Sequence, residues 1–162
     1  MQKKMVLTVI GLLVLLLAAN SAMAAGITFG AKSGPMQLDT DGVEDPINAG
    51  VAVGYEFGIV LGDIGLEGEF TTTVKEGEIG IQRLKLDTAG AYVTYRSPGF
   101  IYLKGRAGYV GWDADFNQNG TDDDTGASYG AGLGFNLKIV KFELEYTKID
   151  DDIDFISLGI QF

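Results

Sequence analysis

Apolar and polar residues alternate along the chain after residue 25, and this period of two constrains the fold more than any other feature of the sequence. The clearest run places Val51, Val53, Tyr55 and Phe57 on one face, with glycine, alanine and Glu56 on the other. Successive side chains of a β-strand point to opposite sides, so such a run predicts a strand with one apolar face. No later stretch has a convincing helical period, and we therefore expect an all-β fold.

Eight runs of this kind follow one another, separated by turn signals such as Gly62-Asp63 and Ser97-Pro98-Gly99. They cover residues 27–32, 50–58, 64–75, 84–96, 101–110, 128–138, 142–147 and 154–162. Long acidic connections, among them 34–48 and 113–125, alternate with short turns. This order predicts eight strands joined up and down, each next to its neighbour in sequence.

The run 84–96 is irregular. Leu84 and Leu86 are out of phase with the apolar residues that follow them, such as Ala91 and Val93. One extra residue in a strand moves all later side chains to the opposite face, so a β-bulge near Asp87 would reconcile the two halves.

The first 24 residues have the three parts of a secretory signal peptide. Lys3-Lys4 precedes an apolar run from Met5 to Ala19, and Ala22-Met23-Ala24 supplies small residues for cleavage before Ala25. The apolar run has about 15 residues, short of the roughly 20 that a spanning helix needs. We expect residues 1–24 to be removed and 25–162 to form one domain; the alternative is an uncleaved N-terminal anchor.

Composition excludes several classes of function. Removal of residues 1–24 takes away two lysines and no acid, so the formal charge of −10 becomes −12. A chain this acidic is not expected to bind nucleic acid through a basic patch. It has no cysteine and no histidine, and so neither disulfides nor the commonest metal ligand and general base. We expect no cofactor.

The two faces of the runs differ sharply in charge. Apart from the irregular run, the apolar faces carry none, whereas the opposite faces carry lysines, arginines and glutamates. A soluble sheet would bury the apolar face, and a membrane barrel would turn it towards lipid. Acidic residues concentrated in the long connections, aromatic residues near the strand ends, and strands of about 9 to 12 residues favour the membrane barrel.

The last run, 154–162, places Leu158, Ile160 and Phe162 on its apolar face. Together with Gly30-Ala31-Lys32 and with glycine-rich alternations such as Ala52-Val53-Gly54-Tyr55, it resembles the small eight-stranded outer-membrane barrels of the OmpA and OmpX type. The resemblance covers residues 25–162. It implies an antiparallel, up-and-down transmembrane barrel of a Gram-negative outer membrane, with no periplasmic domain and with both ends of the mature chain in the periplasm.

The resemblance also implies partners. The barrel assembly machinery would read Leu158, Ile160 and Phe162 as a folding signal, and outer-membrane lipids and lipopolysaccharide would surround a monomeric barrel. Enzymes that resemble this architecture depend on a histidine, which this chain lacks, so we expect no catalytic activity.

The inward faces predict a network of charges in the lumen. An eight-stranded barrel is filled by its own side chains, and an unpaired charge there would cost several kcal/mol. We therefore expect ion pairs among six residues: Lys32, Glu56, Glu67, Glu69, Lys104 and Arg106.

One acidic connection partly fits a calcium-binding loop. Its candidate ligands are Asp115, Asn117, Asn119, Thr121 and Asp123. Gly126 stands where a bidentate glutamate is required, so this spacing predicts at most a weak site. We favour the alternative, a solvated acidic surface loop.

For function, we expect a structural or surface-interaction role, such as envelope integrity or adhesion. Two alternatives stay open. One is a narrow, gated pore for ions or small solutes. The other is a soluble periplasmic barrel with charged faces outside and an apolar ligand inside.

Overall fold

The computed structural model describes residues 26–39, 43–79, 82–116 and 120–162, which form ten β-strands. The strands are β1 (Ile27–Leu38), β2 (Val43–Glu44), β3 (Ile47–Ile59), β4 (Gly62–Lys75), β5 (Gly77–Ile79), β6 (Gln82–Arg96), β7 (Ile101–Phe116), β8 (Gly120–Asn136), β9 (Lys141–Asp150) and β10 (Ile153–Gln161). Within these residues, no helix is long and apolar enough to cross a bilayer. The expected signal peptide, 1–24, lies outside the described residues.

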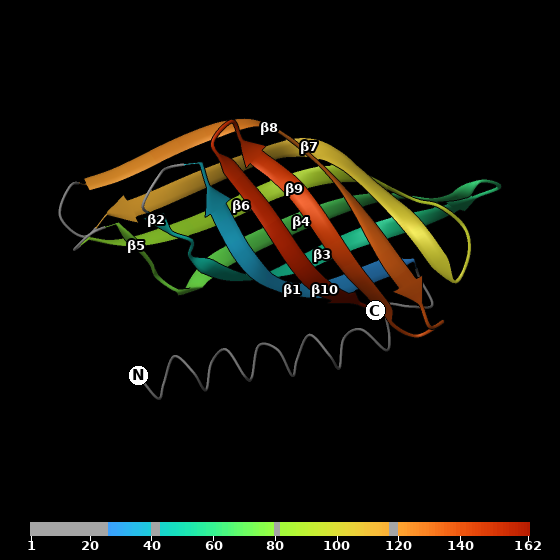
Figure 1. Cartoon of the computed structure of the whole chain (residues 1–162). Coiled ribbons are helices and arrows are strands. Elements are labelled where there is room, and N and C mark those ends of the chain that lie inside the picture. The colour runs from blue at the N-terminus through green and yellow to red at the C-terminus, as the bar shows by residue number, and fades with distance from the viewer. Residues whose placement is uncertain (1–25, 40–42, 80–81, 117–119) are drawn as a thin grey trace.

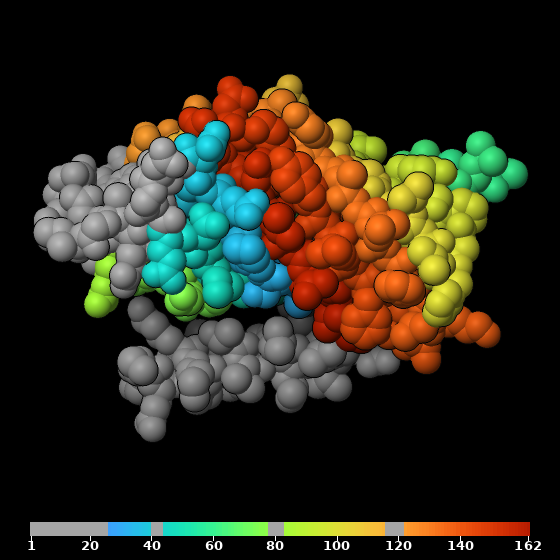
Figure 2. Space-filling model, viewed as in Figure 1, coloured from blue at the N-terminus to red at the C-terminus, as the bar shows by residue number. Residues whose placement is uncertain are grey.

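Eight of the strands close into an antiparallel barrel (Figure 1). The wall runs β1-β3-β4-β6-β7-β8-β9-β10, and β10 returns to β1 with Gly30 opposite Gln161 and Leu38 opposite Ile153. On the face shown in Figure 2, side chains of β1, β10 and β9 pack side by side without a break. Every strand of a closed wall is paired on both sides. A bilayer requires this, because its core has no water to satisfy unpaired backbone groups. The predicted eight-stranded up-and-down barrel is confirmed.

The two ends of the barrel differ. Residues 60–61, 97–100 and 137–140 make short turns at the end where β1 begins and β10 finishes, which we call the turn end. At the opposite end, which we call the arm end, the connections are long. Both β2 and β5 lie there (Figure 1): β5 pairs with the first residues of β6, and β2 pairs with β5.

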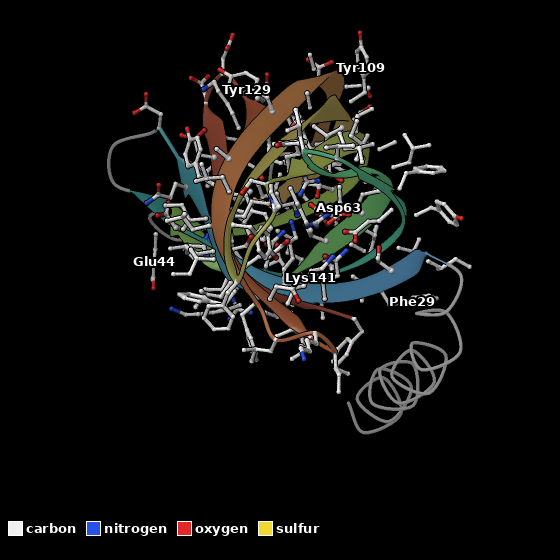
Figure 3. The ribbon with its side chains drawn as sticks, turned by 90° about the vertical axis from the view of Figure 1, so that its right-hand side faces the viewer. Phe29, Glu44, Asp63, Tyr109, Tyr129 and Lys141 are labelled. Atoms are coloured by element: carbon white, nitrogen blue, oxygen red, sulfur yellow. The ribbon has the colours of Figure 1, made fainter. Side chains whose placement is uncertain are left out.

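The wall turns its apolar residues outward and its charged residues inward. Val53 and Leu133 are about half exposed on the outside, whereas Glu67 and Lys104 are buried. Tyr109 and Tyr129 also lie on the outside of the ring of strands (Figure 3), and both are more than half exposed. The alternative of a soluble barrel with charged faces outside is therefore wrong.

The proposed bulge in the fourth run is also wrong. Pairing between β6 and β7 runs without a shift from Leu84 opposite Phe116 to Arg96 opposite Lys104. Leu84 and Leu86 point into the lumen and are fully buried. The apolar phase changes along β6 because the contents of the lumen change, while the backbone register continues.

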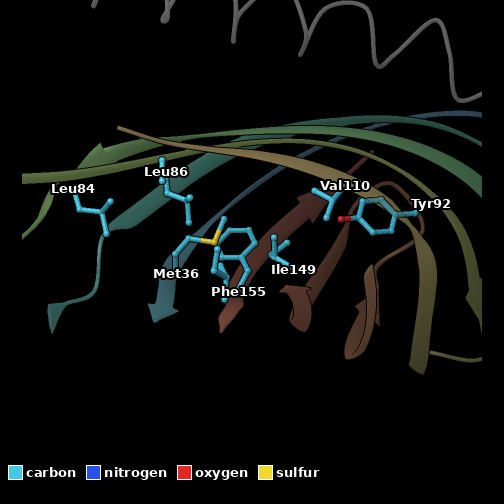
Figure 4. Packing of buried hydrophobic residues seen from close by; sticks show 9 residues of the cluster. Met36, Leu84, Leu86, Tyr92, Val110, Ile149 and Phe155 are labelled. Atoms are coloured by element: carbon cyan, nitrogen blue, oxygen red, sulfur yellow. The ribbon is translucent and has the colours of Figure 1, made fainter. Parts of the chain in front are cut away.

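An apolar cluster fills the lumen towards the arm end, which the alternation of the runs did not predict. Phe155 of β10 packs beside Met36 of β1 at its centre (Figure 4). The other buried members are Leu84, Leu86, Tyr92, Val110, Ala114, Ile149 and Ile153, and Leu38 and Trp112 pack against them. This set is called the lumen cluster below.

The acidic stretch 113–125, expected to be a loop, is largely a β-hairpin. Strands β7 and β8 stay paired through Asp113 opposite Asp123 as far as Phe116 opposite Gly120. The charged side chains at 113, 115 and 122–124 are exposed, so extending the ladder does not bury them. Similarly, β1 continues to Leu38, inside the stretch expected to be a connection.

Candidate functional site

Ten charged residues line the lumen between the lumen cluster and the turn end. Five are basic (Lys32, Arg96, Lys104, Arg106 and Lys141) and five are acidic (Glu56, Glu67, Glu69, Glu143 and Glu145). This set, called the lumen charge network, has no net formal charge. Seen from the turn end, polar atoms crowd the space inside the ring of strands (Figure 3).

Arg106 stands at the centre of the network. Its Nη1 donates hydrogen bonds to Glu69 Oε2 at 2.8 Å and to Glu145 Oε1 at 2.6 Å. The guanidinium also stacks on the ring of Tyr92, 3.4 Å from its centroid, which links the network to the lumen cluster. Lys32 Nζ lies 2.6 Å from the same two carboxylates. Each central charge thus has at least two partners of opposite sign.

A second group lies nearer the turn end, around Arg96. Its Nε donates to Glu143 Oε1 at 2.8 Å, and its Nη1 donates to Glu56 Oε1 at 2.6 Å. Lys104 bridges the two groups, with Nζ at 2.8 Å from Glu143 Oε2 and 2.6 Å from Glu145 Oε2. The network is therefore continuous along the lumen.

Glycines on the inner faces provide the space for these side chains. A β-carbon at Gly134 would lie 2.3 Å from the ring of Tyr102, whose hydroxyl donates to Glu143 at 2.8 Å. At Gly132 it would lie 2.7 Å from a backbone oxygen of β9, beside Glu145. The glycines thus allow neighbouring strands and large polar side chains to fill a narrow lumen.

The structure brings together all six residues expected in the lumen, and four more with them. Sequence reasoning placed Glu143 and Glu145 on an inward face but left them out of the candidate network. It left out Arg96 because the phase of its run was unresolved, and Lys141 because the predicted run began one residue later, at Phe142. Alternation carried through β6 without a bulge would have found Arg96.

The described residues do not form the ligand geometry of the hypothetical calcium site. Asn117 and Asn119 lie outside them, as does the side chain of Thr121. Asp115 and Asp123 are exposed, on paired strands of a hairpin that continues through the stretch. Among the described residues, no three acidic side chains are grouped closely enough to hold a metal ion.

The end of β10 closes the wall. Leu158 and Ile160 point outward, and Phe162 exchanges two backbone hydrogen bonds with Phe29, at 2.8 and 3.0 Å. The three residues expected to form an assembly signal therefore lie along the seam between the first and last wall strands. Their recognition by assembly machinery stays a prediction.

The tip of the β7–β8 hairpin is the second candidate site. We call residues 111–116 and 120–127 the arm. Pairing between β8 and β9 begins at Tyr129, and the residues of β8 before it pair with β7 alone (Figure 1). Among the described strands, none covers the outer edge of β8 here. The edge carries Asp122, Asp123 and Asp124, all exposed.

The closed barrel, its outward apolar belt and its charged lumen agree with a sequence comparison. Residues 7–162 match the profile of the outer membrane protein beta-barrel domain. The chain belongs to this family. Membership implies that the barrel lies in the outer membrane, as expected from the sequence. No curated protein sequence gives a significant match.

Solved structures of the same architecture include three natural barrels. Ail of Yersinia pestis, the attachment invasion locus protein, is 25% identical with a TM-score of 0.56, and the match covers 84% of this chain and 96% of Ail. Neisserial surface protein A is 14% identical with a TM-score of 0.60, covering 85% and 96%. The N-terminal barrel of Pseudomonas aeruginosa OprF is 16% identical with a TM-score of 0.56, also covering 85% and 96%. The last two likenesses concern the fold alone.

Proposed function

We propose that this barrel anchors an acidic β-sheet arm at the cell surface, where the arm binds a cationic, extended segment of a partner protein. The observation that carries the proposal is the free, acidic edge of β8 in the arm. An open strand edge offers backbone donors and acceptors to another extended chain, and a row of aspartates selects for a basic one. The arm end then faces outward and the turn end faces the periplasm.

The negative charge of the arm favours a partner of the opposite charge to the molecule bound in one structure of Ail. A structure of Ail contains sucrose octasulfate, a heparin analogue and therefore a polyanion. In this chain the arm carries Asp113 and Asp115 in addition to Asp122–Asp124, and Asp150–Asp152 lie at the end of β9 and in the β9–β10 turn. Repulsion between like charges disfavours a polyanion on this surface.

The lumen gives the pore alternative no corresponding support. In the described structure, the lumen cluster fills the barrel towards the arm end, and the neutral lumen charge network fills it towards the turn end. An ion would have to displace buried apolar side chains and then break paired charges. We infer that the filled lumen is the structural support of the arm. Surrounding outer-membrane lipids and lipopolysaccharide, assembly by the barrel machinery and a monomeric state remain part of this proposal.

The test measures binding of a synthetic peptide of alternating lysine and valine to the mature barrel in nanodiscs. We expect the triple variant Asp122→Asn, Asp123→Asn, Asp124→Asn to weaken binding by about tenfold or more, since each exposed charge pair contributes up to about 1 kcal/mol. The matched control, Asp150→Asn, Asp151→Asn, Asp152→Asn, removes the same charge from the end of β9 and the turn that follows it, outside the arm. Equal losses in the two variants, or tighter binding of heparin than of the peptide, would refute the proposal.

A further inference from the structure

A small hollow opens at the turn end of the barrel, where the start of β1, the end of β10 and the β8–β9 turn meet. Its volume is about 160 Å³. Its polar lining comes from Thr28, Glu56, Lys138, Lys141 and Gln161, and its apolar rim includes Ile27 and Ile139. This volume suits a group of a few heavy atoms, and two of the five polar residues are basic.

Lys138 adopts a backbone conformation that costs stability. Its φ is 72°, and Ile139 N donates to Leu137 O at 2.9 Å, so Lys138 is the central residue of a tight three-residue turn. Glycine would adopt this conformation without strain. Such strain points to a role for the side chain itself. Among the described residues, no carboxylate forms an ion pair with the Lys138 ammonium.

Gln161 supplies the second independent observation. It is only 6% exposed and lines the hollow, but its Oε1 accepts no hydrogen bond from the described residues. A buried acceptor without a donor costs free energy. Neighbouring Glu56 is already paired with Arg96 at 2.6 Å and with Lys141 at 2.5 Å. Within the described part of the chain, the hollow is therefore lined by an ammonium without an ion pair and by a residue whose buried amide oxygen lacks a donor.

We propose that this hollow binds the phosphoglycerol headgroup of an anionic phospholipid in the periplasmic leaflet. The phosphate pairs with Lys138, and a glycerol hydroxyl donates to Gln161 Oε1. Ile27 and Ile139 on the rim are exposed and continue the apolar outer surface, along which the acyl chains lie. With Glu56 already paired with Arg96 and Lys141, Lys138 leaves the hollow positive, which favours this headgroup over a zwitterionic one. The inference depends on the orientation of the barrel and is independent of binding by the arm.

The experiment reconstitutes the mature barrel in nanodiscs of nine parts phosphatidylethanolamine to one part phosphatidylglycerol, and then counts retained lipids by native mass spectrometry. We expect one phosphatidylglycerol per barrel, enriched over its bulk share by about tenfold, the usual value of one charge-assisted hydrogen bond. Lys138→Gln and Gln161→Leu should each return the ratio to bulk. Lys85→Gln is the matched control, because Lys85 lies on β6 near the arm end, next to Glu76.

A second variant separates binding from folding. Lys138→Gly removes the same charge while relieving the strain, so it should fold at least as well as the natural chain and still lose the lipid. Three outcomes would each overturn the proposal. The natural chain could enrich phosphatidylethanolamine instead, it could retain the two lipids at their bulk ratio, or Lys138→Gln could enrich phosphatidylglycerol as strongly as the natural chain does. Soluble glycerol phosphate that abolishes the enrichment at micromolar concentration would overturn the lipid as its source.

Discussion

Replacing Arg106 by methionine tests whether the lumen charge network behaves as a paired, water-poor core. The Arg106 side chain is fully buried, with two carboxylates at 2.6 and 2.8 Å and a third at 3.6 Å. Methionine keeps much of the packing volume but leaves five acids facing four bases. Removal of one partner from a buried pair costs about 3–5 kcal/mol. Lys32 still contacts Glu69 and Glu145, so we expect the lower part of that range from charge alone.

The stacking of Arg106 on Tyr92 adds to this cost. A desolvated cation–π contact contributes about 1–2 kcal/mol, which brings the expected loss for Arg106→Met to about 4 kcal/mol. The double variant Arg106→Met, Glu69→Gln restores charge balance. It should be less destabilised than the sum of its single variants, with a coupling of about 1–3 kcal/mol.

The assay is urea unfolding of the barrel in lipid vesicles. Trp112, the only tryptophan, packs against the lumen cluster and reports the transition by its fluorescence, and unboiled gel mobility reports the closed barrel. Arg83→Met is the control, because Arg83 is 65% exposed and lies 3.4 Å from Glu76. It should change the free energy of unfolding by less than about 1 kcal/mol. A similarly small effect of Arg106→Met would show that water screens the lumen charges and would refute the argument.

Three further substitutions test other parts of the wall. Phe155→Ala removes the centre of the lumen cluster and should cost about 3–5 kcal/mol in the same urea assay, with a smaller loss meaning that the cluster collapses around the gap. Gly108→Ala should prevent formation of the heat-modifiable barrel, since its β-carbon would lie 1.9 Å from Ala91 O; Gly105→Ala meets nothing within 4 Å and should fold normally. Leu133→Arg places a charge on the outer apolar belt and should cost about 2–4 kcal/mol in vesicles, and an unchanged midpoint would contradict a lipid-facing position.

The barrel itself could be predicted because alternation states directly which side chains share a face. The run 50–58 has large apolar residues on one side and glycine, alanine and Glu56 on the other, and the structure keeps this division. Alternation cannot say how far a strand continues once both faces become polar. For this reason, the acidic extension of β7 and β8 was expected to be a loop. The extension is held by pairing between the two strands, for example of Asp113 with Asp123. The alternation within a single strand gives no information about this pairing.

The omission of Arg96 from the predicted network follows from a different limit, seen in β6. Its inward residues run from Leu84 and Leu86 through Tyr92 to Arg96, from the lumen cluster into the lumen charge network. From about Ala89 onward the strand faces lipid, and from there its outward residues are apolar. A change of apolar phase therefore has two causes: a bulge that shifts the register, or a lumen whose contents change along the strand. The two can be separated by length, because a bulge adds a residue that the partner strand lacks. Here β7 matches β6 residue for residue, so the switch marks the boundary between the apolar and charged parts of the lumen.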